Sequence, residues 1–248
     1  MKSTLIFPAG TSEAIRFAAG QLHKKGIPLI DHPSPEITHL LLDVPSFDAD
    51  GNLQDGRKLH TLLERVPENV TVIGGGLKNP DLANYHTLDL LQNEDYLCPN
   101  AAITAECALR IAARKLKTAF RNTPTLVIGW GRIGKCLAQL LQAMGAPVCV
   151  AARKKKDRAI LQALGFEAIG TDAGIGRFQL ILNTVPESVF SEKIAKCADC
   201  VKIDLASRKG LAGDDVIWAR GLPGKLAPES SGQLIADTIL RYMTEEAL

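Results

Sequence analysis

Three glycines near the middle of the chain have the spacing of a phosphate-binding turn. Gly129, Gly131 and Gly134 form a GxGxxG pattern. In such a pattern the first glycine allows a tight turn, the second lets the backbone approach a pyrophosphate, and the third lets a helix pack closely on a strand. Free N–H groups at the start of that helix would meet the phosphate charge. The alternative is a glycine-rich turn of an unrelated α/β domain, so the flanking segments must be considered.

The flanking segments favour dinucleotide binding. An apolar run at 126–128 predicts a buried parallel strand before the glycines, and a second apolar run at 148–151 predicts the next strand. Between them lies an amphipathic helix that ends at Gly145 and has its apolar residues on one face, namely Ile133, Leu137, Leu140, Leu141 and Met144. The unit has the length of about 30 residues expected of a strand–helix–strand start. We therefore assign Arg132 and Ile133, together with the three glycines, to a cofactor site.

The end of the second strand bears on which nicotinamide cofactor is bound. An acidic residue there usually holds the ribose of NAD, but this chain has Arg153, followed by Lys154, Lys155 and Lys156. A carboxylate would repel a 2′-phosphate, whereas a guanidinium can bind it with two hydrogen bonds. We expect NADP, contacted by Arg153 and Lys154. The alternative is a solvated basic turn that starts the next helix.

Two further apolar strands end in polar groups that would lie at the same edge of the sheet. The segments QLILNTVP and KIDLASR close at residues 183–186 and 204–208, and ligands of such sheets bind at the carboxyl ends of the strands. Arg208 is the candidate catalytic residue, because a guanidinium just past a parallel strand can fork onto a substrate carboxylate. Its alternative is a surface arginine on a loop. The remaining contacts expected here are Thr184, Val185, Pro186, Leu205 and Ala206 for the cofactor and Ser207 for the substrate.

The alternation of strands and helices predicts an α/β protein with two domains. We expect a smaller N-terminal α/β domain on the substrate side at 1–98, a linker helix at 99–120 after a break at Pro99 and Asn100, an NADP-binding domain at 121–229 and a C-terminal helix at 230–248. The second domain would be a Rossmann-type doubly wound parallel sheet. Glu106 would face a cleft from the linker helix, or would simply complement the positive end of that helix.

Composition limits the possible partners. The chain of 248 residues has a net charge of +2, which argues against nucleic acid. No apolar run approaches a membrane span, and the N-terminus lacks a signal peptide pattern, so we expect a cytoplasmic protein without a membrane partner. Cys197 and Cys200 form one CxxC without a second pair or a nearby histidine, so no metal site is expected.

Five segments of the chain resemble the dipicolinate synthase A family of spore-forming bacteria. They occur in order over roughly residues 93–241 and read NEDYLCPNAAITAE, VIGWGRIGK, ILNTVP, IDLASRKG and GLPGKLAPESSGQLIADTI, of which the last two are the most specific. The resemblance implies an oxidoreductase of sporulation that acts with the flavoprotein-like B subunit of dipicolinate synthase and converts dihydrodipicolinate to dipicolinate with NADP. A homo-oligomer is also possible. Residues that could then hold a second substrate carboxylate are Asn100, Thr104 and Lys225.

A more distant resemblance to 2-hydroxy acid dehydrogenases leaves the reaction open. Arg208 falls on the strand-end arginine with which those enzymes orient a substrate carboxylate. Their catalytic histidine lies in a later Pro-His step, and the corresponding stretch here, 222–225, has no histidine. Three functions are therefore considered: the dipicolinate enzyme, an NADP-dependent 2-hydroxy or keto acid dehydrogenase, and a non-catalytic NADP-binding subunit.

Overall fold

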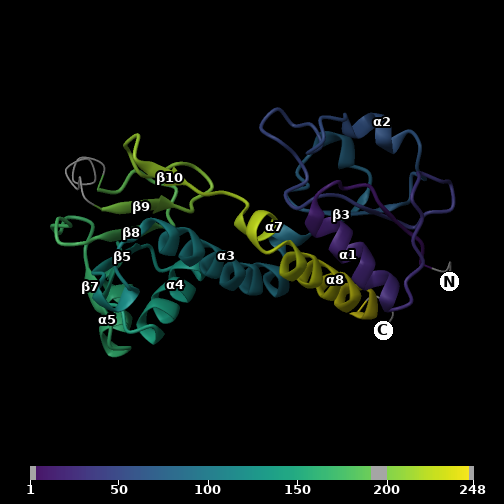
Figure 1. Cartoon of the computed structure of the whole chain (residues 1–248). Helices are drawn as coiled ribbons and strands as arrows, with labels where there is room; N and C mark the ends of the chain where they lie inside the picture. The colour runs from purple at the N-terminus through teal and green to yellow at the C-terminus, as the bar shows by residue number, and fades with distance from the viewer. Residues whose placement is uncertain (1–3, 191–199, 246–248) are drawn as a thin grey trace. The chain divides into compact units, whose positions relative to one another are not determined.

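The computed structural model describes residues 4–190 and 200–245 and divides the chain into two compact units (Figure 1). The first unit comprises Met1–Asn100 and Pro223–Leu248, and the second comprises Ala101–Leu222. Each unit is built on its own parallel β-sheet. The α/β class predicted from the sequence is confirmed.

The first unit has a sheet of four parallel strands in sequential order. The strands are β1 (Ile6–Pro8), β2 (His39–Leu41), β3 (Thr71–Gly74) and β4 (His86–Asp89). The short helix α2 (Leu59–Leu63) and the 3₁₀ turns at Pro80–Leu82 and Leu90–Gln92 lie in the connections. Strand β4 is hard to recognise from the sequence, because only Leu88 among its four residues is apolar and buried.

Two helices pack against each other in the first unit. Helix α1 (Glu13–Lys24) starts at the N-cap Ser12, whose hydroxyl accepts a hydrogen bond from the backbone N–H of Ile15. It lies beside α8 (Pro228–Glu245), the final helix (Figure 1). A Cβ at Gly232 would come within 2.6 Å of the carbonyl oxygen of Ala14, so this glycine lets the two backbones approach. The helix expected at 230–248 thus begins slightly earlier and is part of the first unit.

Helix α3 (Glu94–Lys115) runs through the proline where the sequence predicted a break. Pro99 lies inside the helix and removes one backbone donor near its start, but the helix gains the burial of small apolar side chains further on, namely Ala101, Ala105, Cys107, Ala108 and Ala112. The predicted break is therefore wrong. The boundary between the two units falls within this helix, between Asn100 and Ala101.

The second unit has a six-stranded parallel sheet with the order β10-β9-β8-β5-β6-β7. Its strands are β5 (Thr125–Ile128), β6 (Val148–Ala151), β7 (Glu167–Ile169), β8 (Leu180–Asn183), β9 (Val201–Asp204) and β10 (Val216–Trp218). Numbered from β5, this is the order 6-5-4-1-2-3 of a doubly wound Rossmann sheet. The order in which strands are added reverses between β5 and β8, which is the switch point of the sheet. The predicted fold is confirmed, although the three-residue strand β10 was missed.

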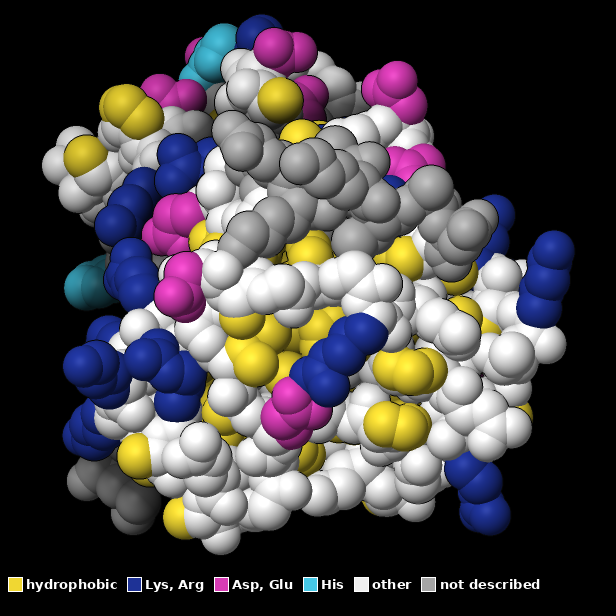
Figure 2. All heavy atoms as spheres, turned by 90° about the vertical axis from the view of Figure 1, so that its left-hand side faces the viewer, with side chains coloured by type: hydrophobic (Ala, Val, Ile, Leu, Met, Phe, Trp, Pro, Cys, Tyr) yellow, Lys and Arg dark blue, Asp and Glu magenta, His cyan; other side chains and the backbone are white. Residues whose placement is uncertain are grey.

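Helices α4 (Arg132–Ala143) and α5 (Lys155–Ala163) contact the β5, β6 and β7 half of this sheet. Another group of strand side chains, including Leu126 and Cys149, packs against residues of the connections, including Ile175, Phe178 and Leu211. Figure 2 views the side of the molecule that is on the left in Figure 1, and hydrophobic side chains gather in the middle of this face. No helix of the described residues is long and apolar enough to cross a membrane.

Candidate nucleotide-binding site

The turn from β5 to α4 has the geometry that its three glycines predict. Gly129 has a φ of +104°, a conformation that residues with a Cβ rarely adopt. A Cβ on Gly134 would overlap the carbonyl oxygen of Gly129, so the first turn of α4 packs directly on the end of the strand. Replacing Gly129 would strain the backbone and crowd the side chains of Thr184 and Val185, whereas replacing Gly134 would force the backbone of the turn and the helix apart.

Gly131 fits the space that a pyrophosphate needs. It is exposed, it is the N-cap residue of α4, and a Cβ built on it would meet no atom within 4 Å. Gly131 has no side chain that could cap this helix. In the first turn that follows, Arg132 is exposed and Ile133 is half-buried. The start of α4 thus combines an open approach with the positive end of a helix dipole, as phosphate binding requires.

The end of β8 lies against this turn, at the switch point where the strand order of the sheet reverses. Thr184 donates its backbone N–H and its hydroxyl to the carbonyl oxygen of Ile128, at 2.9 and 2.8 Å. A Cβ on Gly129 would come within 2.7 Å of a methyl group of Val185. Thr184, Val185 and the neighbouring Pro186 are half-buried. The structure therefore brings together cofactor candidates that are more than fifty positions apart in the sequence.

The end of β6 carries the basic residues expected to decide the cofactor. Arg153 and Lys154 are exposed, and Lys154 is the N-cap residue of α5 without a side-chain cap. Arg158, which the sequence analysis did not consider, donates from one Nη1 atom to the carbonyl oxygens of Ala152 and Arg153, at 2.7 and 2.8 Å. This side chain holds the backbone of the loop, and its signal in the sequence was only an arginine in the helix that follows.

A buried carboxylate organises the loop that carries Arg208. Asp204, at the end of β9, is fully buried, and its Oδ1 accepts from the side-chain amide of Asn183 and the N–H of Ala206, each at 3.0 Å. Its Oδ2 accepts from the backbone N–H groups of Gly210 and Leu211, at 2.7 and 2.8 Å. These four donors therefore fix both ends of the loop.

The fixed loop exposes the residues expected to touch substrate. Leu205 and Ala206 are buried at its start, whereas Ser207 and Arg208 are exposed. No acceptor among residues 4–190 and 200–245 pairs with the Arg208 guanidinium. Because β5, β8 and β9 are neighbours with parallel directions, this loop and the glycine turn lie at the same edge of the sheet.

The other substrate candidates do not share one unit. Thr104 is buried and Glu106 is exposed on the part of α3 that belongs to the second unit, whereas Asn100 and Lys225 belong to the first, with Lys225 in α7 (Leu222–Leu226). Glu106 lies about three turns into α3, because the helix already begins at Glu94. The alternative role of Glu106 at the positive helix end is therefore wrong.

Two buried cysteines of the second unit, Cys107 and Cys149, have thiols whose pKa is raised. Burial raises the pKa of Cys149 to about 11 and also raises the pKa of Cys107. The described residues contain no cluster of three or more histidine, cysteine or acidic side chains that could hold a metal ion. Cys197, one half of the CxxC pair, lies outside the described residues.

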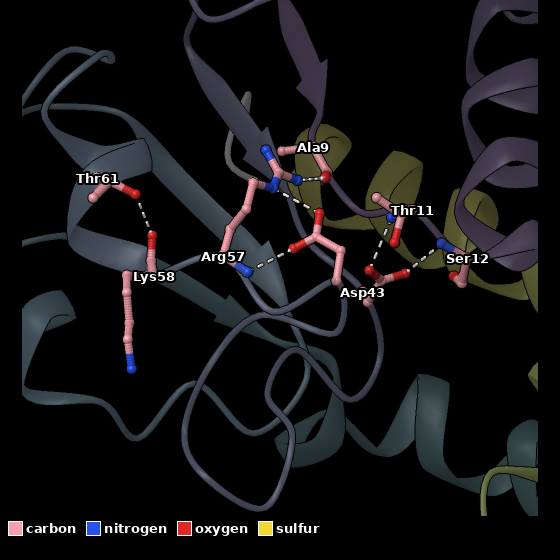
Figure 3. A network of polar contacts seen from close by, with 8 residues as sticks. Ala9, Thr11, Ser12, Asp43, Arg57, Lys58 and Thr61 are labelled. Atoms are coloured by element: carbon pink, nitrogen blue, oxygen red, sulfur yellow. Dashed lines mark hydrogen bonds and ion pairs between the residues drawn. The ribbon is translucent and has the colours of Figure 1, made fainter.

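The first unit contains a second strand–turn–helix, in which an acidic side chain occupies the start of the helix. Asp43, just after the end of β2, accepts from the N–H groups of Thr11 and Ser12 at 2.9 and 3.0 Å (Figure 3). Arg57 donates from Nη2 to the carbonyl oxygen of Ala9 at 2.8 Å. The turn from β1 to α1 is thus filled by side chains of the chain itself.

Comparisons with known proteins agree with this geometry. Residues 89–197 match the family described as D-isomer specific 2-hydroxyacid dehydrogenase, NAD binding domain. The chain is 26% identical over 202 residues to the A subunit of dipicolinate synthase from Bacillus subtilis (strain 168), a match that covers 74% of this chain and 68% of that protein. This match supports a dehydrogenase-type oxidoreductase with a nicotinamide cofactor.

Solved structures with low sequence identity share the fold. The crystal structure of the dipicolinate synthase A subunit from Bacillus halodurans has a TM-score of 0.82 at 20% identity and covers 97% of this chain and 98% of that chain. An NADPH-dependent glyoxylate/hydroxypyruvate reductase from Sinorhizobium meliloti, solved with NADP and sulfate, has a TM-score of 0.54 at 15% identity, covering 99% and 96%. The resemblance inferred from the sequence is therefore confirmed, and the chain is similar to the A subunit of dipicolinate synthase in both sequence and fold.

Proposed function

We propose that this chain is the oxidoreductase subunit that converts dihydrodipicolinate to dipicolinate with NADP during sporulation, in the cytoplasm and together with the flavoprotein-like B subunit of dipicolinate synthase. The observation that carries the proposal is the exposed Arg208 on the Asp204-anchored loop, at the same sheet edge as the open glycine turn. The similarity to the A subunit of dipicolinate synthase supports the choice of substrate.

The chain's own residues fit NADP. The glycine turn and the first turn of α4 would hold the pyrophosphate, with Arg132 exposed beside it, and Arg153 and Lys154 would bind the 2′-phosphate. Thr184 and Val185 would border the nicotinamide at the switch point, with Pro186, Leu205 and Ala206 nearby. When bound, NADP supplies the acceptor for the hydride that leaves the substrate ring.

Arg208 would bind a substrate carboxylate and orient the ring, while Ser207 lies next to it on the loop. The segment 222–225 has no histidine that could act as a base. An alcohol oxidation needs a base for the hydroxyl proton, whereas a dihydropyridine becomes an aromatic ring when it loses a hydride and a proton. Positioning by the protein could then account for most of the catalysis.

Cofactor preference is tested by an Arg153→Asp variant. We expect the parent protein to bind NADPH more tightly than NADH, and the variant to lose or invert this preference. Each lost charged hydrogen bond should cost on the order of 1.5 to 3 kcal/mol, which is roughly tenfold or more in affinity. Fluorescence titration of both cofactors measures this, and equal affinities in the parent protein would contradict an NADP site.

The reaction itself is tested by ultraviolet absorbance of the pyridine product, formed from fresh dihydrodipicolinate and NADP with and without the B subunit. We expect product well above the spontaneous rate, and Arg208→Lys should lower turnover sharply while NADP affinity stays near the parent value, because lysine lacks the planar fork. A parent protein that binds NADP but makes no product would favour the non-catalytic role.

A second candidate is an NADP-dependent 2-hydroxy or keto acid dehydrogenase, which the match of residues 89–197 favours. The missing histidine argues against it. The same assay separates the two functions, because this candidate would reduce simple keto acids with NADPH and would leave dihydrodipicolinate unchanged.

The domain division at 1–98, 99–120, 121–229 and 230–248 stays a prediction, in which the first domain contributes to substrate binding. Limited proteolysis tests it. NADP should protect a fragment that contains residues 121–229 more than the remainder of the chain, if that segment is the nucleotide-binding domain.

A further inference from the structure

Strands β9 and β10 deliver a second arginine to the corner of the sheet that carries Arg208. The two strands are parallel neighbours, with Asp204 opposite Trp218 in the register. The N–H of Ala219 donates to the carbonyl oxygen of Asp204 at 2.8 Å. The chain therefore leaves both strands at the same point, and Arg220 follows β10 as Arg208 follows β9.

The indole of Trp218 links the two arginines. Its Nε1 donates to the carbonyl oxygen of Ala206 at 3.1 Å, two residues before Arg208. Trp218 is nevertheless 45% exposed, and large hydrophobic residues with such exposure are few among the described residues. The guanidinium of Arg220 lies over this ring, 5.3 Å from its centroid. The corner thus presents an exposed aromatic ring with a guanidinium on it, beside the Arg208 loop.

The two lysines on β9 and in the loop after it are already engaged. Lys209 donates to the carbonyl oxygen of Gly213 at 3.1 Å. Lys202 is buried and bonded to Asp215 at 2.5 Å, and this hydrogen bond lowers the pKa of the Asp215 carboxyl. In the described part of the chain, neither Arg208 nor Arg220 has a carboxylate partner. These two guanidinium groups are therefore the ones available to an anionic ligand.

We infer that Arg220 binds the second carboxylate of the substrate, while Arg208 binds the first and the Trp218 ring borders the planar heterocycle. This inference rests on the proposed function and makes dicarboxylate recognition a property of the second unit alone. Two guanidinium groups beside an exposed aromatic side chain match a flat ring that carries two carboxylates, because each guanidinium can form a forked pair with one carboxylate. Arg220 then takes the role for which the sequence suggested Asn100, Thr104 or Lys225.

The test compares pyridine-2,6-dicarboxylate with pyridine-2-carboxylate, each titrated calorimetrically into the full chain saturated with NADP. We expect Arg220→Ala to weaken binding of the dicarboxylate about tenfold or more and to change binding of the monocarboxylate less than about threefold. The reason is that only the dicarboxylate has a second carboxylate whose charged hydrogen bonds to Arg220 can be lost. Arg220→Lys should lie between the parent and Arg220→Ala. Arg208→Ala should weaken both ligands.

Lys209→Ala is the matched control, since it removes a positive charge from the same loop and should leave both affinities near the parent values. Arg220→Ala that leaves dicarboxylate binding intact, or that weakens both ligands equally, would overturn the role of Arg220 while the proposed function stands. A parent protein that binds no dicarboxylate but binds NADP would overturn the proposed function and the role of Arg220 together.

Discussion

The two units contain the same local arrangement, a parallel strand followed by a turn and a helix, but the start of the helix is occupied differently. In the first unit the carboxylate of Asp43 accepts from the N–H groups of Thr11 and Ser12 at the start of α1. In the second unit the N-cap residue of α4 is Gly131, which has no side chain to cap the helix, and a Cβ built on it would meet no atom within 4 Å.

This difference teaches that one kind of turn can serve stability or binding. Helix N-termini attract negative charge because their N–H groups lack partners within the helix. The first unit satisfies this demand internally with Asp43, which is 6% exposed. The second unit leaves it for a ligand. The glycine spacing therefore matters less for the presence of a helix N-terminus than for keeping that N-terminus open.

The largest effect is expected from Gly134→Ala. The new methyl group would overlap the carbonyl oxygen of Gly129, which is backbone and cannot move without separating α4 from β5. We expect a loss of about 3 kcal/mol in the free energy of unfolding, together with loss of NADP binding. Urea denaturation and cofactor titration measure both, with Gly20→Ala, an open helical site in α1, as control. Parent-like stability would contradict the close packing.

Removing the internal anion should be the next largest effect. Asp43→Ala deletes two charge-assisted hydrogen bonds at the start of α1, and we expect a loss of about 2 kcal/mol in the free energy of unfolding with unchanged NADP affinity. Thermal melts should show that inorganic phosphate raises the Tm of this variant more than that of the parent, because the emptied turn can accept an anion. Equal Tm shifts would break the comparison.

Gly131→Ala should separate binding from folding. Its φ of −82° suits any residue and its Cβ would meet no atom, so the free energy of unfolding should change by less than about 0.5 kcal/mol. Affinity for NADP should nevertheless fall about tenfold, because the methyl group enters the space reserved for the pyrophosphate. If NADP titration of this variant gives the affinity of the parent protein, the pyrophosphate does not approach residue 131.

The smallest effect is expected from Arg158→Ala, which frees the carbonyl oxygens of Ala152 and Arg153. We expect NADP affinity to fall by about three- to fivefold through movement of Arg153, with little change for NAD. A double variant with Arg153→Asp distinguishes this role from a merely structural one. If Arg158 acts through Arg153, the losses of NADP affinity in the two single variants will not add in the double variant. Additive losses would contradict that role.

The local sequence was sufficient for the nucleotide-binding unit. Gly129, Gly131 and Gly134 between two apolar strands, with a helix of 3.6-residue periodicity, predicted β5, α4 and β6 and the doubly wound sheet. Such patterns are short-range, because a strand alternates and a helix repeats within a few residues. The exposure of Arg153 and Arg208 at strand ends could be expected for the same reason.

Tertiary structure decided what distant residues do for these turns. The hydrogen bonds from Thr11 and Ser12 to Asp43 join positions 32 and 31 apart. Those from Gly210 and Asn183 to Asp204 close a loop around a buried carboxylate. No periodicity reveals such pairings, since they depend on which strands become neighbours. Likewise, α3 continues through Pro99, where local preference predicts a break, because the residues after the proline are buried. Sequence determined that a turn could bind an anion; packing decided whether the anion is a side chain or a ligand.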